Sequence, residues 1–186
     1  MSLLISGCGG TTETARTGFL KDYSKLQPHP EIEGRFRYIN PKLNLGNYSK
    51  FIVAPVVLSL SKEGKEREID QEDLDEQVTF FHGKILEELG KGGYQIVNHP
   101  GKGVARVRVA ITDIDKTNPA LNINPGMKLT GAGLGGSGME AELVDSVTNE
   151  IIGSVIDFQM GSRLSLTAGL TWFGHAQAVM EDWRKT

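Results

Sequence analysis

The chain has 186 residues and a formal net charge of −3, a size that suits a single domain with its own core. The acidic balance, with a sequence pI near 5.8, excludes the basic footprint of a nucleic-acid-binding protein. We find no run of the roughly 20 apolar residues that a membrane-spanning helix needs, so the sequence predicts no transmembrane segment.

Cys8 is the one cysteine of the chain, which excludes an intramolecular disulfide. It follows Ile5-Ser6-Gly7, an aliphatic residue and two small ones, which is the pattern of a bacterial lipobox with Cys8 as the lipid acceptor. The charged and most of the apolar parts of a signal peptide are missing, so we expect residues 1–8 to be its remnant. The alternative is a chance match at a lone cysteine.

Residues 9–33 are predicted to be a linker and docking segment. Their first part is rich in small polar residues, as a flexible spacer is. Apolar residues at helical spacing then predict one or two helical turns that dock on the domain: Phe19, Leu20, Tyr23 and Leu26. Residues 34–186 are predicted to form a single domain.

The first strands are expected at 35–39, which alternates and suits a sheet edge, and at 50–58, which is almost continuously apolar. A continuous apolar run is typical of a strand buried on both faces. Because proline lacks an N–H group, this strand should end or bulge at Pro55.

A long amphipathic helix follows, with Asp70 as its expected N-cap. Its buried stripe is predicted from apolar residues spaced by three or four: Leu74, Val78, Phe81, Ile85 and Leu89. Three glycines should end it: Gly90, Gly92 and Gly93.

The second half predicts mainly antiparallel strands. A short strand is expected at 94–97 and an alternating one at 104–115. In the latter, Ala105, Val107, Val109 and Ile111 should point inward and Arg106, Arg108 and Thr112 outward. A hairpin should join 139–144 to 151–158, and a closing helix should cover about 172–183. The predicted fold class is therefore α+β, with a mostly antiparallel sheet of about four to six strands and two main helices packed on it.

Glycine and histidine residues give no catalytic or cofactor motif. Gly131, Gly133 and Gly136 match a nucleotide-binding spacing, but a strand is expected after them where a helix is needed. The four histidines do not pair at metal-ligand spacing: His29, His82, His99 and His175. His82, beside the apolar stripe, is expected to be a satisfied, partly buried imidazole. We predict no cofactor, no metal and no catalytic residues.

Acidic and aromatic residues are further candidates for a binding or catalytic site. Paired carboxylates could bind calcium or serve as acid and base, but turns and a solvated strand face are the favoured interpretation for them: Asp113, Asp115, Glu140, Glu142 and Asp145. Trp172, Phe173 and Trp183 are possible interface anchors, although sealing the core is the favoured role.

Three blocks of the sequence resemble a known family: Gly18-Phe19-Leu20-x-Asp22-Tyr23-Ser24-x-Leu26, Tyr38-Ile39-Asn40-Pro41, and Tyr48-x-Lys50-Phe51-x-Val53-x-Pro55-Val56. They look like a proteobacterial lipoprotein family of the domain-of-unknown-function type, family 3313. The similarity runs over essentially the whole mature chain. The resemblance implies no activity and no catalytic residues.

Together these features predict a non-enzymatic bacterial envelope lipoprotein. A lipid on Cys8 would attach it to a membrane, and its partner would be an unidentified envelope protein or component. Gly9 stands where an aspartate would favour inner-membrane retention, a rule that the lipoprotein resemblance implies, so we expect the periplasmic face of the outer membrane. The alternatives are a lipid- or glycan-binding protein, with the glycine-rich segment as a wall, and an envelope hydrolase built around His99 or His175.

Overall fold

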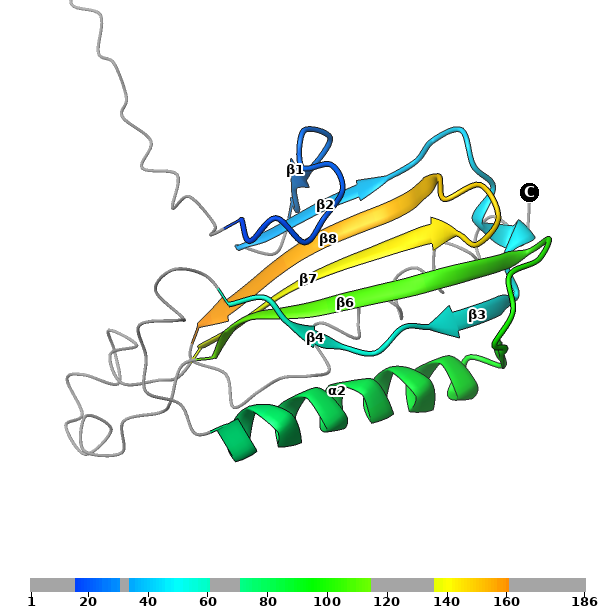
Figure 1. Ribbon diagram of the computed structural model, residues 1–186. Helices are drawn as coiled ribbons and strands as arrows, with labels where there is room; N and C mark the ends of the chain where they lie inside the picture. The colour runs from blue at the N-terminus through cyan, green and yellow to red at the C-terminus, as the bar shows by residue number, and fades with distance from the viewer. Residues whose placement is uncertain (1–15, 31–33, 61–70, 115–135, 161–186) are drawn as a thin grey trace, which may run out of the picture.

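The computed structural model describes residues 16–30, 34–60, 71–114 and 136–160. Within these ranges the chain forms an eight-stranded mixed sheet and one α-helix (Figure 1). The strands and helices are, in chain order, β1 (Gln27–Pro28), β2 (Arg35–Ile39), the 3₁₀ turn η1 (Leu45–Asn47), β3 (Lys50–Val53), β4 (Val57–Leu58), α2 (Gln71–Lys91), β5 (Gln95–Ile96), β6 (Val104–Ile114), β7 (Gly136–Asp145) and β8 (Ile151–Met160).

The sheet has the order β1-β2-β8-β7-β6-β3-β5, with β4 also paired to β6. The pairs β1–β2, β2–β8, β8–β7 and β7–β6 are antiparallel, whereas β3 and β4 run parallel to β6 and β5 runs parallel to β3. The parallel half arises because α2 carries the chain back between β4 and β5, as a crossover helix does.

The predicted fold class, a mostly antiparallel sheet of four to six strands with two main helices, is therefore wrong. The sheet is mixed and has eight strands, and the described residues contain one main helix rather than two. Parallel pairing was missed because it depends on where the crossover returns the chain, which the apolar pattern of a single strand does not record. The closing helix expected at 172–183 lies outside the described residues.

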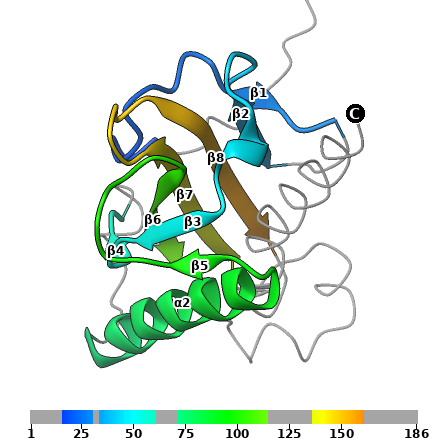
Figure 2. The same ribbon diagram turned by 90° about the vertical axis from the view of Figure 1, so that its right-hand side faces the viewer.

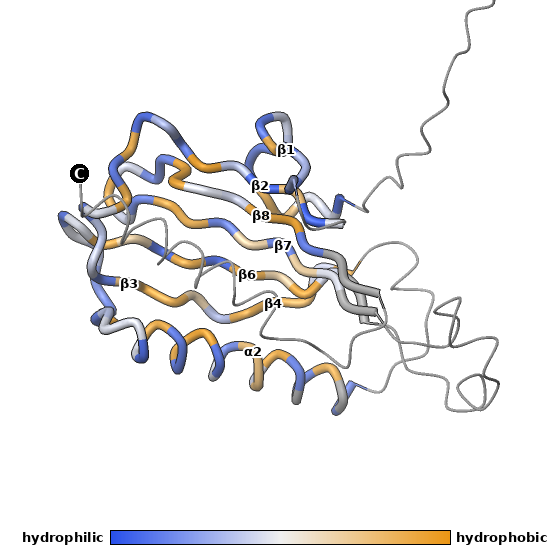
Figure 3. The backbone as a smooth tube through the Cα atoms, turned by 180° about the vertical axis from the view of Figure 1, so that it is seen from behind, coloured by the Kyte–Doolittle hydropathy of each residue, from blue (hydrophilic) through white to orange (hydrophobic). Residues whose placement is uncertain are grey.

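The long helix was predicted correctly. Leu74, Phe81, Ile85 and Leu89 of its stripe are buried and Val78 packs partly buried against the core. Figure 3 shows α2 mainly apolar on the side toward β3 and β4 and mainly polar on the far side. The helix ends at Lys91, and Gly93 takes a φ of 75° just beyond it, a left-handed conformation that glycine adopts at low cost.

Strand alternation divides the sheet into two faces. Residues of one face pair across β6 and β7, Val107 with Leu143 and Val109 with Ala141, and they join Ile85 of α2 in one buried cluster. The helix lies along the β3 and β4 side of the sheet, while residues 16–26 lie at the other side (Figures 1 and 2).

Several strand predictions are confirmed. The run at 50–58 is divided into β3 and β4 around Pro55, and the 139–158 hairpin forms with longer strands than expected. Strand β2 forms as predicted but lies inside the sheet, between β1 and β8. Thr112 was expected to point outward, yet it is buried, at the point where the register of β6 on β7 shifts.

Within the described residues, no helix is long and apolar enough to cross a bilayer.

Candidate functional site

Two glutamates lie fully buried on the face of the sheet opposite the α2 core. Glu140 and Glu142 are each 0% exposed and alternate along β7 with the core residue Ala141. Their cross-strand neighbours are Ala110 and Arg108 on β6. Because successive strand residues point to opposite faces, both carboxyl groups project from the same side of the sheet. The prediction that they form a solvated strand face is wrong.

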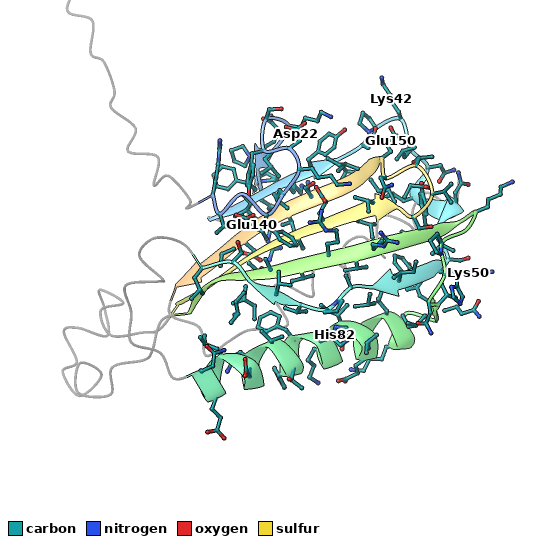
Figure 4. All side chains as sticks on the ribbon, in the orientation of Figure 1. Asp22, Lys42, Lys50, His82, Glu140 and Glu150 are labelled. Carbon is teal, nitrogen blue, oxygen red and sulfur yellow. The ribbon has the colours of Figure 1, made fainter. Side chains whose placement is uncertain are left out.

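The segment of residues 16–26, here called the strap, covers these glutamates. It was expected to form helical turns, but it contains bends and a turn rather than a helix. Figure 4 shows Glu140 on the side of the sheet where the strap residue Asp22 lies, with His82 of α2 on the opposite side. The spacing of its apolar residues misled the prediction, since only Leu20 of the strap is buried.

Glu140 accepts two hydrogen bonds from the strap. The backbone N–H of Thr17 donates to Oε1 at 2.9 Å, and the hydroxyl of Tyr23 donates to Oε2 at 2.6 Å. Both donors are neutral, and within the described residues no cation contacts this carboxylate. A buried charge is costly unless its oxygens are hydrogen-bonded, so the strap is what makes the burial of Glu140 tolerable.

Tyr23 organises the beginning of the strap. Its hydroxyl oxygen accepts the N–H of Gly18 at 2.8 Å and that of Leu20 at 3.2 Å, while its proton goes to Glu140. Burial of the phenol, reinforced by the bond to Glu140, raises the pKa of Tyr23. Gly18 has a φ of 86°, which lets the chain turn tightly around this hydroxyl.

Glu142 binds the strap and a cation together. The backbone N–H of Lys21 donates to Oε1 at 3.0 Å, and Nη1 of Arg108 donates to Oε2 at 2.6 Å. The guanidinium of Arg108 also lies 4.8 Å from the centroid of the Phe19 ring, which is cation–π geometry. Arg108 was expected to point outward; its side chain is only 31% exposed because the strap lies over it.

The chemistry of this arrangement is that of a peptide clamp. Two carboxylates present acceptors to backbone N–H groups and to the phenol hydroxyl of one segment, the strap. Across the described part of the chain, no group of three or more His, Cys, Asp or Glu side chains could hold a metal ion. Since the strap occupies the acceptor oxygens, the arrangement favours holding a segment of chain over proton transfer to a substrate.

A second buried charge pair links the sheet strands. Nε of Arg35 on β2 donates to Oδ2 of Asp157 on β8 at 3.0 Å, and Nη2 donates to the same oxygen. The two residues are direct cross-strand neighbours, with 3% and 2% exposure. This pair fixes the register of β2 on β8, because a shift by one residue would move each charge to the other face.

His82 and Ser154 have buried polar atoms without a partner in the described residues, Nδ1 and Oγ respectively. His82 is partly buried as expected, but the prediction that its imidazole is satisfied is wrong at this nitrogen. His99 is exposed, at the expected turn.

The other predicted site residues divide into two groups. Asp145 forms a turn as favoured, accepting the N–H groups of Val147 and Thr148 at 2.9 and 2.8 Å. The remainder lie outside the described residues: Cys8, Asp115, Gly131, Gly133, Trp172, Phe173, His175 and Trp183. The strand expected after the glycines is present, since β7 starts at Gly136.

Sequence reasoning missed the roles of Tyr23, Arg108, Arg35 and Asp157. One signal was available: Glu140 and Glu142 interrupt an otherwise apolar strand at positions of one face. Charges at such positions are either solvated or covered, and sequence alone does not say which.

Comparison with known proteins places the chain in a family. The model of the family described as "Protein of unknown function (DUF3313)" matches residues 15–186, so the chain belongs to that family, and the predicted resemblance is confirmed. No curated protein matches the chain.

Among solved structures, the chain is similar to two PelC dodecamers from Paraburkholderia phytofirmans, a point variant in space group C2 and PelC in space group P6. Sequence identity is 15% and the TM-score 0.43 for both. The match covers 78% of this chain and 89% of that chain in one form, and 72% and 87% in the other. A likeness of this extent carries no argument about function.

Proposed function

We propose that this member of the family is a bacterial envelope lipoprotein, anchored through lipid on Cys8, that presents its domain to another envelope protein or component without catalysing a reaction. The observation that carries the proposal is the lipobox Ile5-Ser6-Gly7-Cys8. Acylation and diacylglyceryl transfer would give this residue several fatty chains, which suffice for stable anchoring.

The clamp on the sheet supports a presenting role. Glu140 and Glu142, the most deeply buried carboxylates, are engaged by the chain's own strap. The first described hydrogen bond to these glutamates comes from Thr17, and eight residues (9–16) lie between Thr17 and Cys8. Such a linker spans at most about 28 Å when fully extended, which would keep the domain near the membrane surface.

Metabolic labelling tests the anchor. The full-length protein should incorporate radiolabelled palmitate, and Cys8→Ser should abolish the label, because serine offers no thiol for lipid transfer. Ser6→Ala, which keeps a small residue in the lipobox, is the matched control and should still be labelled. Labelling of the Cys8→Ser protein would refute the anchor.

The outer membrane is the proposed destination, with the domain on the periplasmic face. Envelope fractionation should recover the protein with the outer membrane, and Gly9→Asp should move it to the inner membrane. Recovery of the unsubstituted protein with the inner membrane would contradict the destination and leave the lipid anchor in place.

A further inference from the structure

We propose that the strap is a releasable latch, which can leave the sheet while the remainder of the domain stays folded. When it is closed, Glu140 and Glu142 hold it. When it is open, the two carboxylates face water and the chain before β2 is free to extend.

This part of the chain buries few of its side chains completely, which supports local release. Between Arg16 and Pro30, Leu20 is the one buried side chain, and β1 contributes just two residues to the sheet edge. Segments with few buried apolar contacts open at lower free energy than the core. The hydrogen bonds to Glu140 and Glu142 are therefore a substantial part of the attachment.

The polar contacts also favour a small difference in free energy between the closed and open states. Closing the strap removes two carboxylates from water, and Glu140 receives only neutral donors in return. Opening breaks these hydrogen bonds but restores full hydration to both carboxylates, so the loss is largely offset. Arg108 remains beside Glu142 on the neighbouring strand in either state.

Release would change the reach of the domain, a consequence that rests on the proposed lipid anchor. With the strap closed, residues 9–16 separate Cys8 from the sheet. With the strap open and β1 also released from β2, the free chain runs to Gly34, where β2 is about to begin, and spans up to roughly 90 Å when fully extended. The latch would then decide whether the domain stays at its membrane or reaches across the envelope.

Amide hydrogen exchange on the full chain tests the latch without requiring the anchor. The amides of Thr17 and Lys21, which bond to the two glutamates, should exchange at least tenfold faster than those of Val107 and Ala141 in the central strands. Glu140→Gln should accelerate exchange at Thr17 further, and Glu142→Gln should do so at Lys21, with Val107 unchanged.

Glu88→Gln on the outer side of α2 is the matched control and should leave all four amides as they are. If Thr17 and Lys21 exchange at the rate of the central strands, or if Glu140→Gln accelerates all four together, the strap is part of one cooperative unit and the proposal fails. No acceleration at Thr17 in Glu140→Gln would equally overturn the role of the carboxylate.

Reach is measured separately, in acylated protein on phosphatidylethanolamine–phosphatidylglycerol vesicles. A dye on Val147→Cys, an exposed position, reports energy transfer to labelled lipid headgroups. The Glu140→Gln, Glu142→Gln double variant should show lower transfer than Glu88→Gln. Equal energy transfer in the two variants, in protein that mass spectrometry shows to be acylated, would overturn the control of reach by the strap. If mass spectrometry finds no acyl group, the lipid anchor is refuted instead. The hydrogen-exchange result would still test the latch in that case.

Discussion

The hydroxyl of Tyr23 donates a 2.6 Å hydrogen bond to Oε2 of Glu140, joining residues 117 positions apart in the chain. This bond connects the first described segment to the middle of the sheet. It also couples two groups that would both be costly to bury alone, a phenol and a carboxylate. The strap and the acidic face of β7 therefore form one structural unit.

Removing that hydroxyl should weaken the strap measurably. In Tyr23→Phe, Glu140 loses a donor, and the free energy of unfolding should fall by about 1 kcal/mol. The loss in free energy of unfolding is limited, because the strap can open and return Glu140 to water. Urea unfolding of Tyr23→Phe, Glu140→Gln and the double variant should give a coupling energy above about 0.5 kcal/mol. Additive effects would contradict the bond, and Tyr38→Phe, on β2, is the control for losing a phenol.

The Arg35–Asp157 pair should be far more sensitive than any surface pair. Asp157→Ala leaves a buried guanidinium without its carboxylate, and we expect a loss of about 3–5 kcal/mol in the free energy of unfolding. Glu87→Ala breaks the exposed pairs with Lys84 and Lys91 and should change stability within experimental error. Similar losses for the two variants, by chemical denaturation, would show that the internal pair is not buried as described.

Alkaline pH should destabilise the fold through Tyr48. Burial, helped by the hydrogen bond to Asp145, raises the pKa of Tyr48 to about 12. The folded state therefore keeps this proton where the unfolded chain loses it, near pH 10. The stabilisation is complete below pH 10 and is lost as pH rises toward 12.

Comparison with Tyr48→Phe isolates this effect, because Tyr23 titrates in both proteins. Between pH 10 and 12 the unsubstituted protein should lose about 2 kcal/mol more than the variant. The ultraviolet absorbance of tyrosinate would report the ionisation directly. Parallel stability curves for the two proteins would refute the raised pKa.

Core packing between α2 and the sheet should show the usual cost of a cavity. Ile85 is 2% exposed, whereas Phe80, on the same helix, is 46% exposed. We expect Ile85→Ala to lower the free energy of unfolding by about 2–5 kcal/mol and Phe80→Ala to change it by less than about 0.5 kcal/mol. Thermal and urea unfolding both measure this difference. A larger loss of stability for Phe80→Ala than for Ile85→Ala would mean that α2 packs on the sheet with the face that carries Phe80.

The elements that follow from a repeating local pattern in the sequence were predicted correctly. The stripe from Leu74 to Leu89 and the alternation from Ala105 to Ile111 each repeat over several turns or strand residues, so their buried faces were assigned correctly. The division of 50–58 followed from the missing N–H of Pro55. These features need no knowledge of what lies elsewhere in the fold.

Long-range pairing could not be predicted in the same way. Glu140 was expected to be solvated because a glutamate on a strand face usually is, and nothing near it in sequence reveals that Tyr23 covers it. The buried pair of Arg35 with Asp157 spans 122 positions, so it too depends on strand order. The parallel half of the sheet was missed for the same reason.

The proposed envelope role depends most on the lipid at Cys8, and mass spectrometry of the native protein purified from its own envelope tests for this lipid most directly. We predict a mature chain that begins at Cys8 and carries diacylglycerol on the thiol and a fatty acyl group on the amine. An N-terminal peptide with a free Cys8 thiol, or with residues before it still attached, would contradict the anchor and the envelope role proposed from it.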